Sequence, residues 1–108
     1  MPEQQVLYLT TTGRVSGLPR EIEIWYVSSG GKLYLLAEHF HKAHWVRNIA
    51  ASPLVKVRLD GCEFTATARA LDPERDRNTW ELAQGLARKK YGWGEGLAVE
   101  ITPEEIDD

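Results

Sequence analysis

The sequence predicts a mainly β (α+β) protein, a small antiparallel barrel of six strands with two helices packed outside it. Six short segments either are rich in β-branched and aromatic residues or alternate between apolar and polar residues, and short turns join most of them. Two other segments have helical patterns, which gives the order β-β-β-α-β-β-α-β. Strands joined by hairpin turns do not form a doubly wound parallel sheet, so we expect a barrel.

The first three strands are expected at residues 6–12, 21–27 and 32–37. In the second strand, apolar side chains on one face alternate with two glutamates and a tryptophan on the other. The turns at residues 13–17 and 28–31 contain glycines, which adopt positive φ at little cost. These three strands therefore form an antiparallel meander.

A loop at residues 38–42 leads to a short helix at 43–51, which ends before Pro53 because proline stops a helix. Strands at 54–59 and 63–71 follow, joined by an Asp-Gly hairpin turn.

The second helix is expected to start with Asp72 as its N-cap and Pro73 as its first residue. It runs to about Tyr91 and stops at Gly92, and residues 97–102 form the last strand.

The length of 108 residues fits a single domain, residues 1–108, with one core. A deep two-sided pocket within one copy would consume much of that core, so we expect a homodimer with the ligand between the copies. The net charge of −3 does not suggest nucleic-acid binding. Five basic residues of the first half suit a small anionic ligand: Arg14, Arg20, Lys32, Lys42 and Arg47.

The location is expected to be cytoplasmic. The single cysteine cannot form an intrachain disulfide, and the N-terminus lacks the features of a signal peptide. No segment approaches the roughly 18–20 apolar residues of a membrane span.

Hydroxyls, glycine amides and two arginines converge on the first hairpin, including Thr12, Arg14, Ser16 and Arg20. Such a hairpin is a reasonable cradle for phosphate or carboxylate oxygens. The alternative is a basic hairpin whose glycines serve turn geometry only.

Three histidines, His39, His41 and His44, have a spacing that offers three nitrogens to a metal. No cysteine or aspartate nearby completes a familiar site. We therefore predict no metal and favour a solvent-exposed or anion-facing loop, in which Lys42 and a partly protonated histidine contact an anionic tail.

Trp45 and Asn48 lie on one face of the first helix and offer an aromatic ring and an amide to a planar ligand, although Trp45 alternatively anchors the helix on the barrel. No nucleophile or catalytic side chain is evident. A bound cofactor that carries the reaction fits this inventory.

Residues 9–20 (Leu-Thr-Thr-Thr-Gly-Arg-Val-Ser-Gly-Leu-Pro-Arg) closely resemble the signature segment of the deazaflavin-dependent nitroreductase family, which includes quinone-reductase-like members. Residues 45–49 (Trp-Val-Arg-Asn-Ile), with the Ala-Ala-Ser-Pro and Val-x-Val that follow, are similar to its second signature. Residues 90–94 (Lys-Tyr-Gly-Trp-Gly) resemble the ending of a short subgroup.

The resemblance implies a split β-barrel of the FMN-binding type, usually dimeric. It also implies coenzyme F-420, an 8-hydroxy-5-deazaflavin with an anionic tail, as the hydride donor to a nitro, quinone or enone substrate. By this resemblance, the family's cofactor-binding positions fall on Arg14, Ser16 and Arg20 at the tail, Glu23 and Ile24 at the ring, and Trp45 and Asn48 on the helix.

Tyr91 and Trp93 are expected either to cap the substrate pocket or to belong to the core. Two alternatives keep the fold. The first is an FMN-dependent reductase or oxidase, and the second is a non-enzymatic protein that binds a flavin, haem or acyl ligand.

Overall fold

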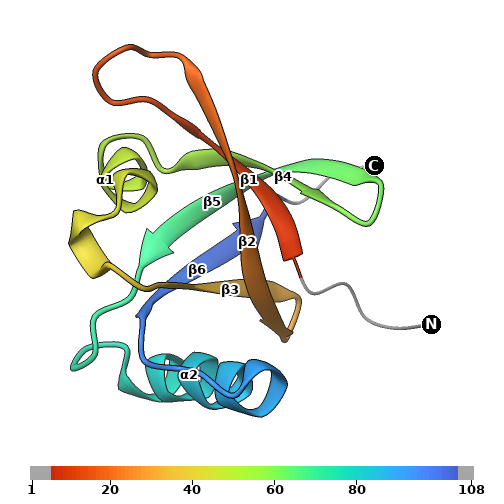
Figure 1. Ribbon diagram of the computed structural model, residues 1–108, viewed down its shortest axis with the longest axis vertical. Coiled ribbons are helices and arrows are strands. Elements are labelled where there is room, and N and C mark those ends of the chain that lie inside the picture. The colour runs from red at the N-terminus through yellow and green to blue at the C-terminus, as the bar shows by residue number, and fades with distance from the viewer. Residues whose placement is uncertain (1–5, 105–108) are drawn as a thin grey trace.

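The structure, a computed structural model, describes residues 6–104 and confirms the predicted fold class: six antiparallel strands form a closed barrel with two α-helices outside it (Figure 1). The elements are β1 (Val6–Thr12), β2 (Pro19–Ser29), β3 (Lys32–Ala37), a 3₁₀ turn η1 (Phe40–Lys42), α1 (His44–Ala51), β4 (Leu54–Leu59), β5 (Cys62–Ala70), α2 (Arg77–Tyr91) and β6 (Leu97–Pro103). No helix in this described range is long and apolar enough to cross a membrane.

The barrel has the strand order β1-β2-β3-β6-β5-β4, and β4 closes it by pairing with β1. Leu9 shows how the register builds the core, since it lies opposite Ile22 of β2 and Val57 of β4. Leu9 and Val57 are fully buried, as are Leu35 and Ile101 from the opposite side of the barrel. Each such side chain contributes about 1.5–3 kcal/mol through its removal from water.

The strand β2 is longer than the predicted 21–27. At its start, Pro19 and Arg20 continue the pairing with β1, and at its end Ser28 and Ser29 continue the pairing with β3. A proline is compatible with the first position of a strand. The change of partner occurs between Trp25 and Tyr26, where pairing with β1 stops and pairing with β3 begins.

The predicted start of α2 is wrong, because the helix begins at Arg77 and not at Pro73. The Asp72 carboxylate accepts hydrogen bonds from the backbone N–H groups of residues 74 and 75 at 2.8 and 3.0 Å. Its own N–H donates to the Asp76 carboxylate at 2.9 Å. These local bonds stabilise a turn that competes with a first helical turn. The predicted end is confirmed, since Gly92 has φ +78 and its N–H donates to Arg88.

The change of partner along β2 opens one side of the barrel. The first half of β2, Pro19 to Trp25, pairs only with β1, while the end of β3, Leu36 and Ala37, pairs only with β6. In Figure 1, α1 lies beside one end of this opening and α2 beside the other. Side chains from all four elements therefore meet there.

Candidate functional site

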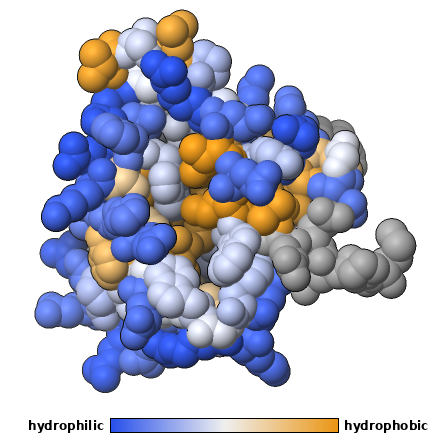
Figure 2. Space-filling model, viewed as in Figure 1, coloured by the Kyte–Doolittle hydropathy of each residue, from blue (hydrophilic) through white to orange (hydrophobic). Residues whose placement is uncertain are grey.

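A cleft of about 730 Å³ occupies the open side of the barrel, a volume typical of small-molecule sites. Figure 2 shows hydrophobic side chains gathered in the middle of this face. The lining residues come from β1, β2, β3, the segment before α1, α1, the end of α2 and the loop after it: Val6, Ile22, Glu23, Ile24, Trp25, Tyr26, Val27, Tyr34, Leu36, Ala37, Glu38, His39, Ala43, Trp45, Ala87, Tyr91 and Trp93.

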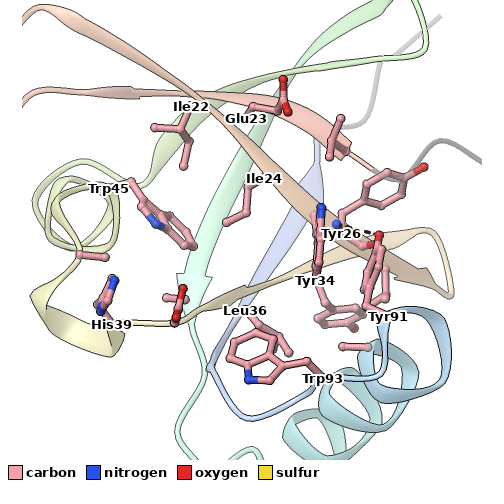
Figure 3. Close-up of a pocket in the computed structure, with 17 residues that line it drawn as sticks. Ile22, Glu23, Ile24, Tyr26, Tyr34, Leu36, His39, Trp45, Tyr91 and Trp93 are labelled. Atoms are coloured by element: carbon pink, nitrogen blue, oxygen red, sulfur yellow. Dashed lines mark hydrogen bonds between the residues drawn. The ribbon is translucent and has the colours of Figure 1, made fainter.

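The end of the cleft beside α1 is apolar. Figure 3 shows Trp45 pointing into it from α1, and Ile24 and Ile22 lying opposite on β2. All three side chains are half-buried and pack against the barrel core. The structure therefore brings two of the predicted ring-contacting residues, Ile24 and Trp45, to the same space.

Glu23, a third predicted ring contact, also lines the cleft, and it lies opposite Tyr8 of β1 in the sheet. A hydrogen bond and the negative charge of Glu23 raise the pKa of the Tyr8 hydroxyl, which lies opposite it on β1. The guanidinium of Arg58 lies 4.2 Å from the centre of the Tyr8 ring. Glu23 thus lies beside a group of polar side chains formed by Tyr8 of β1 and Arg58 of β4.

The end of the cleft beside α2 is aromatic. The ring of Tyr91 stacks on Trp25 with centroids 4.6 Å apart and an interplanar angle of 16°. The Tyr91 hydroxyl donates to the carbonyl oxygen of Tyr26 and accepts from its N–H at 3.3 Å. Lys90 Nζ donates to the same carbonyl at 3.1 Å. Tyr91, predicted to cap the pocket, therefore lines it and holds β2 where that strand changes partner.

Trp93, the other predicted cap, also lines the cleft, below Leu36 in Figure 3. Its position depends on Gly96, because a Cβ there would lie 2.9 Å from both Trp93 Cη2 and the carbonyl oxygen of Ala37. Gln84 of α2 donates to the carbonyl of Gly96 at 3.0 Å. The loop after α2 is thus packed tightly enough to fix the indole.

The hairpin between β1 and β2 projects from the barrel (Figure 1) and carries the predicted anion-binding residues. Its turn is held by the bond from Gly13 N to Leu18 O at 2.8 Å and by Ser16 Oγ, which accepts from Leu18 N at 3.2 Å. Thr12, Arg14, Ser16 and Arg20 are all exposed, and none of them lines the cleft.

Asn48 connects this hairpin to α1. Its amide is buried, and Nδ2 donates to the buried Thr11 hydroxyl at 3.1 Å. Its Oδ1 accepts from Arg14 N at 3.2 Å and from Arg14 Nη1 at 2.9 Å. Asn48, predicted at the cofactor, is not among the residues that line the cleft, and it positions Arg14. Nothing in the local sequence indicates this contact, because Thr11 and Asn48 are 37 positions apart.

Arg14 is consequently held at the first turn of α1, where its Nη2 lies 3.3 Å from His44 Nδ1. The next residue, Trp45, lines the cleft. No side chain among residues 6–104 caps this helix turn. A cationic group and the positive end of a helix thus lie beside the apolar end of the cleft.

The remaining residues of the predicted basic and histidine groups have different partners. Lys32 lies at the start of β3 and forms an ion pair with Glu100 at 3.6 Å. His39 lines the cleft, whereas the carbonyl of His41 accepts a hydrogen bond from Arg47 Nε at 2.9 Å. Within the described range, no three His, Cys, Asp or Glu side chains are grouped to hold a metal ion.

A buried carboxylate, Glu100 on β6, was not predicted as a feature of this region. It accepts from the Tyr34 hydroxyl at 3.3 Å and from Arg69 at 3.4 Å. Burial and the charge of Glu100 raise the pKa of Tyr34. Tyr34 lines the cleft, and its hydroxyl is committed to this network.

Comparison with known proteins decides the family. A family profile described as F420H2-dependent quinone reductase matches residues 1–96. The chain belongs to this family. F420H2 is the reduced form of coenzyme F-420, and the members of the family are reductases, as the signature segments predict.

Solved structures agree with this membership. A reductase dependent on F420H2 (FDR-A) is 26% identical, with a TM-score of 0.66 over 96% of this chain and 97% of that one. A structure described as a domain-swapped dimer is also 26% identical, with a TM-score of 0.67 over 95% of this chain and 82% of that one. HutZ, a haem storage protein of Vibrio cholerae, is 18% identical with a TM-score of 0.76 over 96% and 84%, and supports the fold alone.

Proposed function

We propose that the protein binds reduced coenzyme F-420 at this cleft and reduces a small nitro, quinone or enone substrate. The observation that carries the proposal is the meeting of an apolar cleft and a cationic hairpin at the first turn of α1. Trp45 lines the cleft, and the neighbouring His44 contacts Arg14 of the hairpin. A deazaflavin has the matching chemistry of a flat ring joined to an anionic tail.

The residues present fit this cofactor. Ile24 and Trp45 offer apolar and aromatic surface to a planar ring. Arg14, Arg20 and Lys42 are exposed cations that suit the tail, with the hydroxyls of Thr12 and Ser16 on the same hairpin. Asn48 supports the site indirectly, by fixing the direction of the Arg14 side chain.

The bound reduced cofactor supplies a hydride, which is the chemistry that the side chains lack. The protein's contribution is to hold two planar molecules in contact and to limit the access of water. The stacked Trp25 and Tyr91 form an aromatic wall for the substrate at the α2 end of the cleft. A volume of about 730 Å³ lies within the range of small-molecule sites and suits the insertion of a planar ring.

Titration of the purified protein with coenzyme F-420 and, separately, with FMN tests the assignment by fluorescence. We expect F-420 to bind and FMN to bind more weakly. Preference for FMN would favour an FMN-dependent reductase or oxidase, and binding of neither would contradict a flavin site of either kind.

Charge reversal tests the placement of the anionic tail. Arg14→Glu should weaken F-420 binding by one to two orders of magnitude, about 1.5–3 kcal/mol for a charge-assisted contact. Arg77→Glu is the matched control, because Arg77 is an exposed residue at the start of α2 and does not line the cleft. Equal affinities of the two variants would show that the tail lies elsewhere.

We also infer that the protein is a homodimer. Large hydrophobic side chains are exposed on the hairpin tip and on the strands, among them Val15 (93%), Leu18 (57%), Trp25 (51%) and Leu54 (53%). A second copy would remove such surface from water, and a relative with 26% identity is described as a domain-swapped dimer. Light scattering at micromolar concentration should give twice the mass of the chain, and a monomer mass would contradict the inference.

A further inference from the structure

The turn between β3 and η1 places a titratable side chain at the cleft. Glu38 and His39 both line the cleft, and both are exposed to solvent. Figure 3 shows His39 on the same side of the cleft as Trp45. The next residue, Phe40, has φ +51, a conformation that bulky side chains rarely adopt. The residue that directly follows His39 thus has an unusual backbone conformation, and His39 itself lies at the cleft.

The reduction needs a proton as well as a hydride. A quinone that takes up one hydride gains two electrons and becomes a hydroquinone monoanion, and one proton on its oxygen completes the neutral hydroquinone. Reduced F-420 loses one hydride and one proton when it is oxidised, so the reaction balances overall. That proton does not travel with the hydride, and a side chain or water delivers a proton to the quinone oxygen.

The other titratable groups of the cleft are poorly suited to donate it. The hydroxyl of Tyr34 is bonded to Glu100, and that of Tyr91 to the backbone of Tyr26. Tyr26 itself is buried, with Lys90 Nζ 4.2 Å from the centre of its ring. Carboxylate side chains as a class are poor proton sources near neutral pH, because they ordinarily carry no proton there. Imidazole, in contrast, gains and loses a proton in the physiological range.

The charged groups of the neighbouring elements leave His39 available. On η1 the remaining charged and titratable residues are His41 and Lys42, and on α1 they are His44 and Arg47. Arg47 donates to the carbonyl of His41, and His44 contacts Arg14. Within residues 6–104, the imidazole of His39 takes part in no hydrogen bond or ion pair. Its nitrogens are therefore available to bond to a ligand in the cleft.

We propose that His39 is the proton donor of the reduction: its imidazolium N–H gives a proton to the oxygen of a quinone as the quinone accepts the hydride. Neutral His39 is then reprotonated from solvent, to which it is exposed. This inference rests on the proposed function and adds the source of the proton to it.

The experiment compares His39→Gln with His41→Gln in the full-length protein, using reduced F-420 and menadione as the quinone. His41 is the matched control, since it is an exposed histidine two positions away that does not line the cleft. His39→Gln should lower kcat about 100-fold, the range of general acid catalysis, and should remove the dependence of kcat on pH between about 5 and 8. Its affinity for F-420 should stay within about twofold of the wild-type value, and His41→Gln should keep both the rate and the pH profile.

A second measurement does not depend on turnover. In cofactor-free protein, menadione should shift the NMR resonance of the His39 imidazole, assigned as the histidine signal missing from His39→Gln, and should leave the His41 signal in place. If the wild type turns over and His39→Gln has the same rate and the same pH profile, the role of His39 is overturned while the proposed function stands. Failure of the wild type to bind or oxidise reduced F-420 would overturn the proposed function and, with it, this inference.

Discussion

Replacing Asn48 with alanine removes three hydrogen bonds that join α1 to the first hairpin. The bond from Nδ2 to Thr11 is buried at both ends, so its loss leaves the Thr11 hydroxyl without a partner at a cost of about 1–3 kcal/mol. The two bonds to Arg14 lie where water replaces them, and we assign about 0.5 kcal/mol to each. The free energy of unfolding should therefore fall by about 2–4 kcal/mol, which lowers the urea midpoint by about 1–2 M.

The measurement is urea denaturation of the cofactor-free protein. Arg47→Gln, an exposed neighbour on the same helix, should stay within about 0.5 kcal/mol of the wild type. In a double-mutant cycle, Thr11→Val should reduce the cost of Asn48→Ala by about 1 kcal/mol, because the two side chains share one bond. If Asn48→Ala and Arg47→Gln were equally stable without cofactor, Asn48 would not have the tethering role assigned to it.

Two further predictions concern α2 and the segments that flank it. Gly96→Ala should lower the free energy of unfolding by about 1–3 kcal/mol, because the new methyl group meets Trp93. Gly85→Ala, at an exposed position of α2 with open space around the glycine, should raise the free energy of unfolding by about 0.5–1 kcal/mol. Thermal or urea unfolding that found Gly96→Ala more stable than Gly85→Ala would contradict this packing. Hydrogen bonds from Asp72 N–H and Arg69 lower the pKa of Asp76, so its ionised form stabilises the fold above the ordinary aspartate pKa of about 4, and this stabilisation disappears as the pH falls. Asp76→Asn should therefore lose less stability than the wild type between about pH 4 and pH 2, and equal slopes in acid denaturation would refute that assignment.

Much of the fold was predictable because its signals act between neighbouring residues. The bounds of β1, β3 and β4 were predicted as observed, since alternation and the flanking turn residues mark them directly. The Asp60-Gly61 turn was predicted in the same way, and both residues have positive φ. The start of α2 was predicted incorrectly, because an aspartate such as Asp72 is equally suited to cap a helix and to close a local turn.

The site was predictable only in part. Ile24 was predicted at the cofactor, Trp45 at the cofactor or as an anchor of its helix, and Tyr91 and Trp93 at the substrate pocket or in the core; all four line one cleft. The involvement of Asn48 with Thr11 and Arg14 could not be foreseen, since helical periodicity says which face a side chain is on and not what it meets there.

The sequence alone therefore determined the six strands, their hairpins and the family, because the residues that specify each of them lie close together in the chain. The tertiary structure determined where β2 exchanges β1 for β3 and which side chains border the resulting cleft. Tyr91 bonds to the backbone of Tyr26 from 65 positions away, and His39 faces the same space from a third element. No local pattern encodes such a meeting, because it depends on closing the barrel around a core that all six strands share.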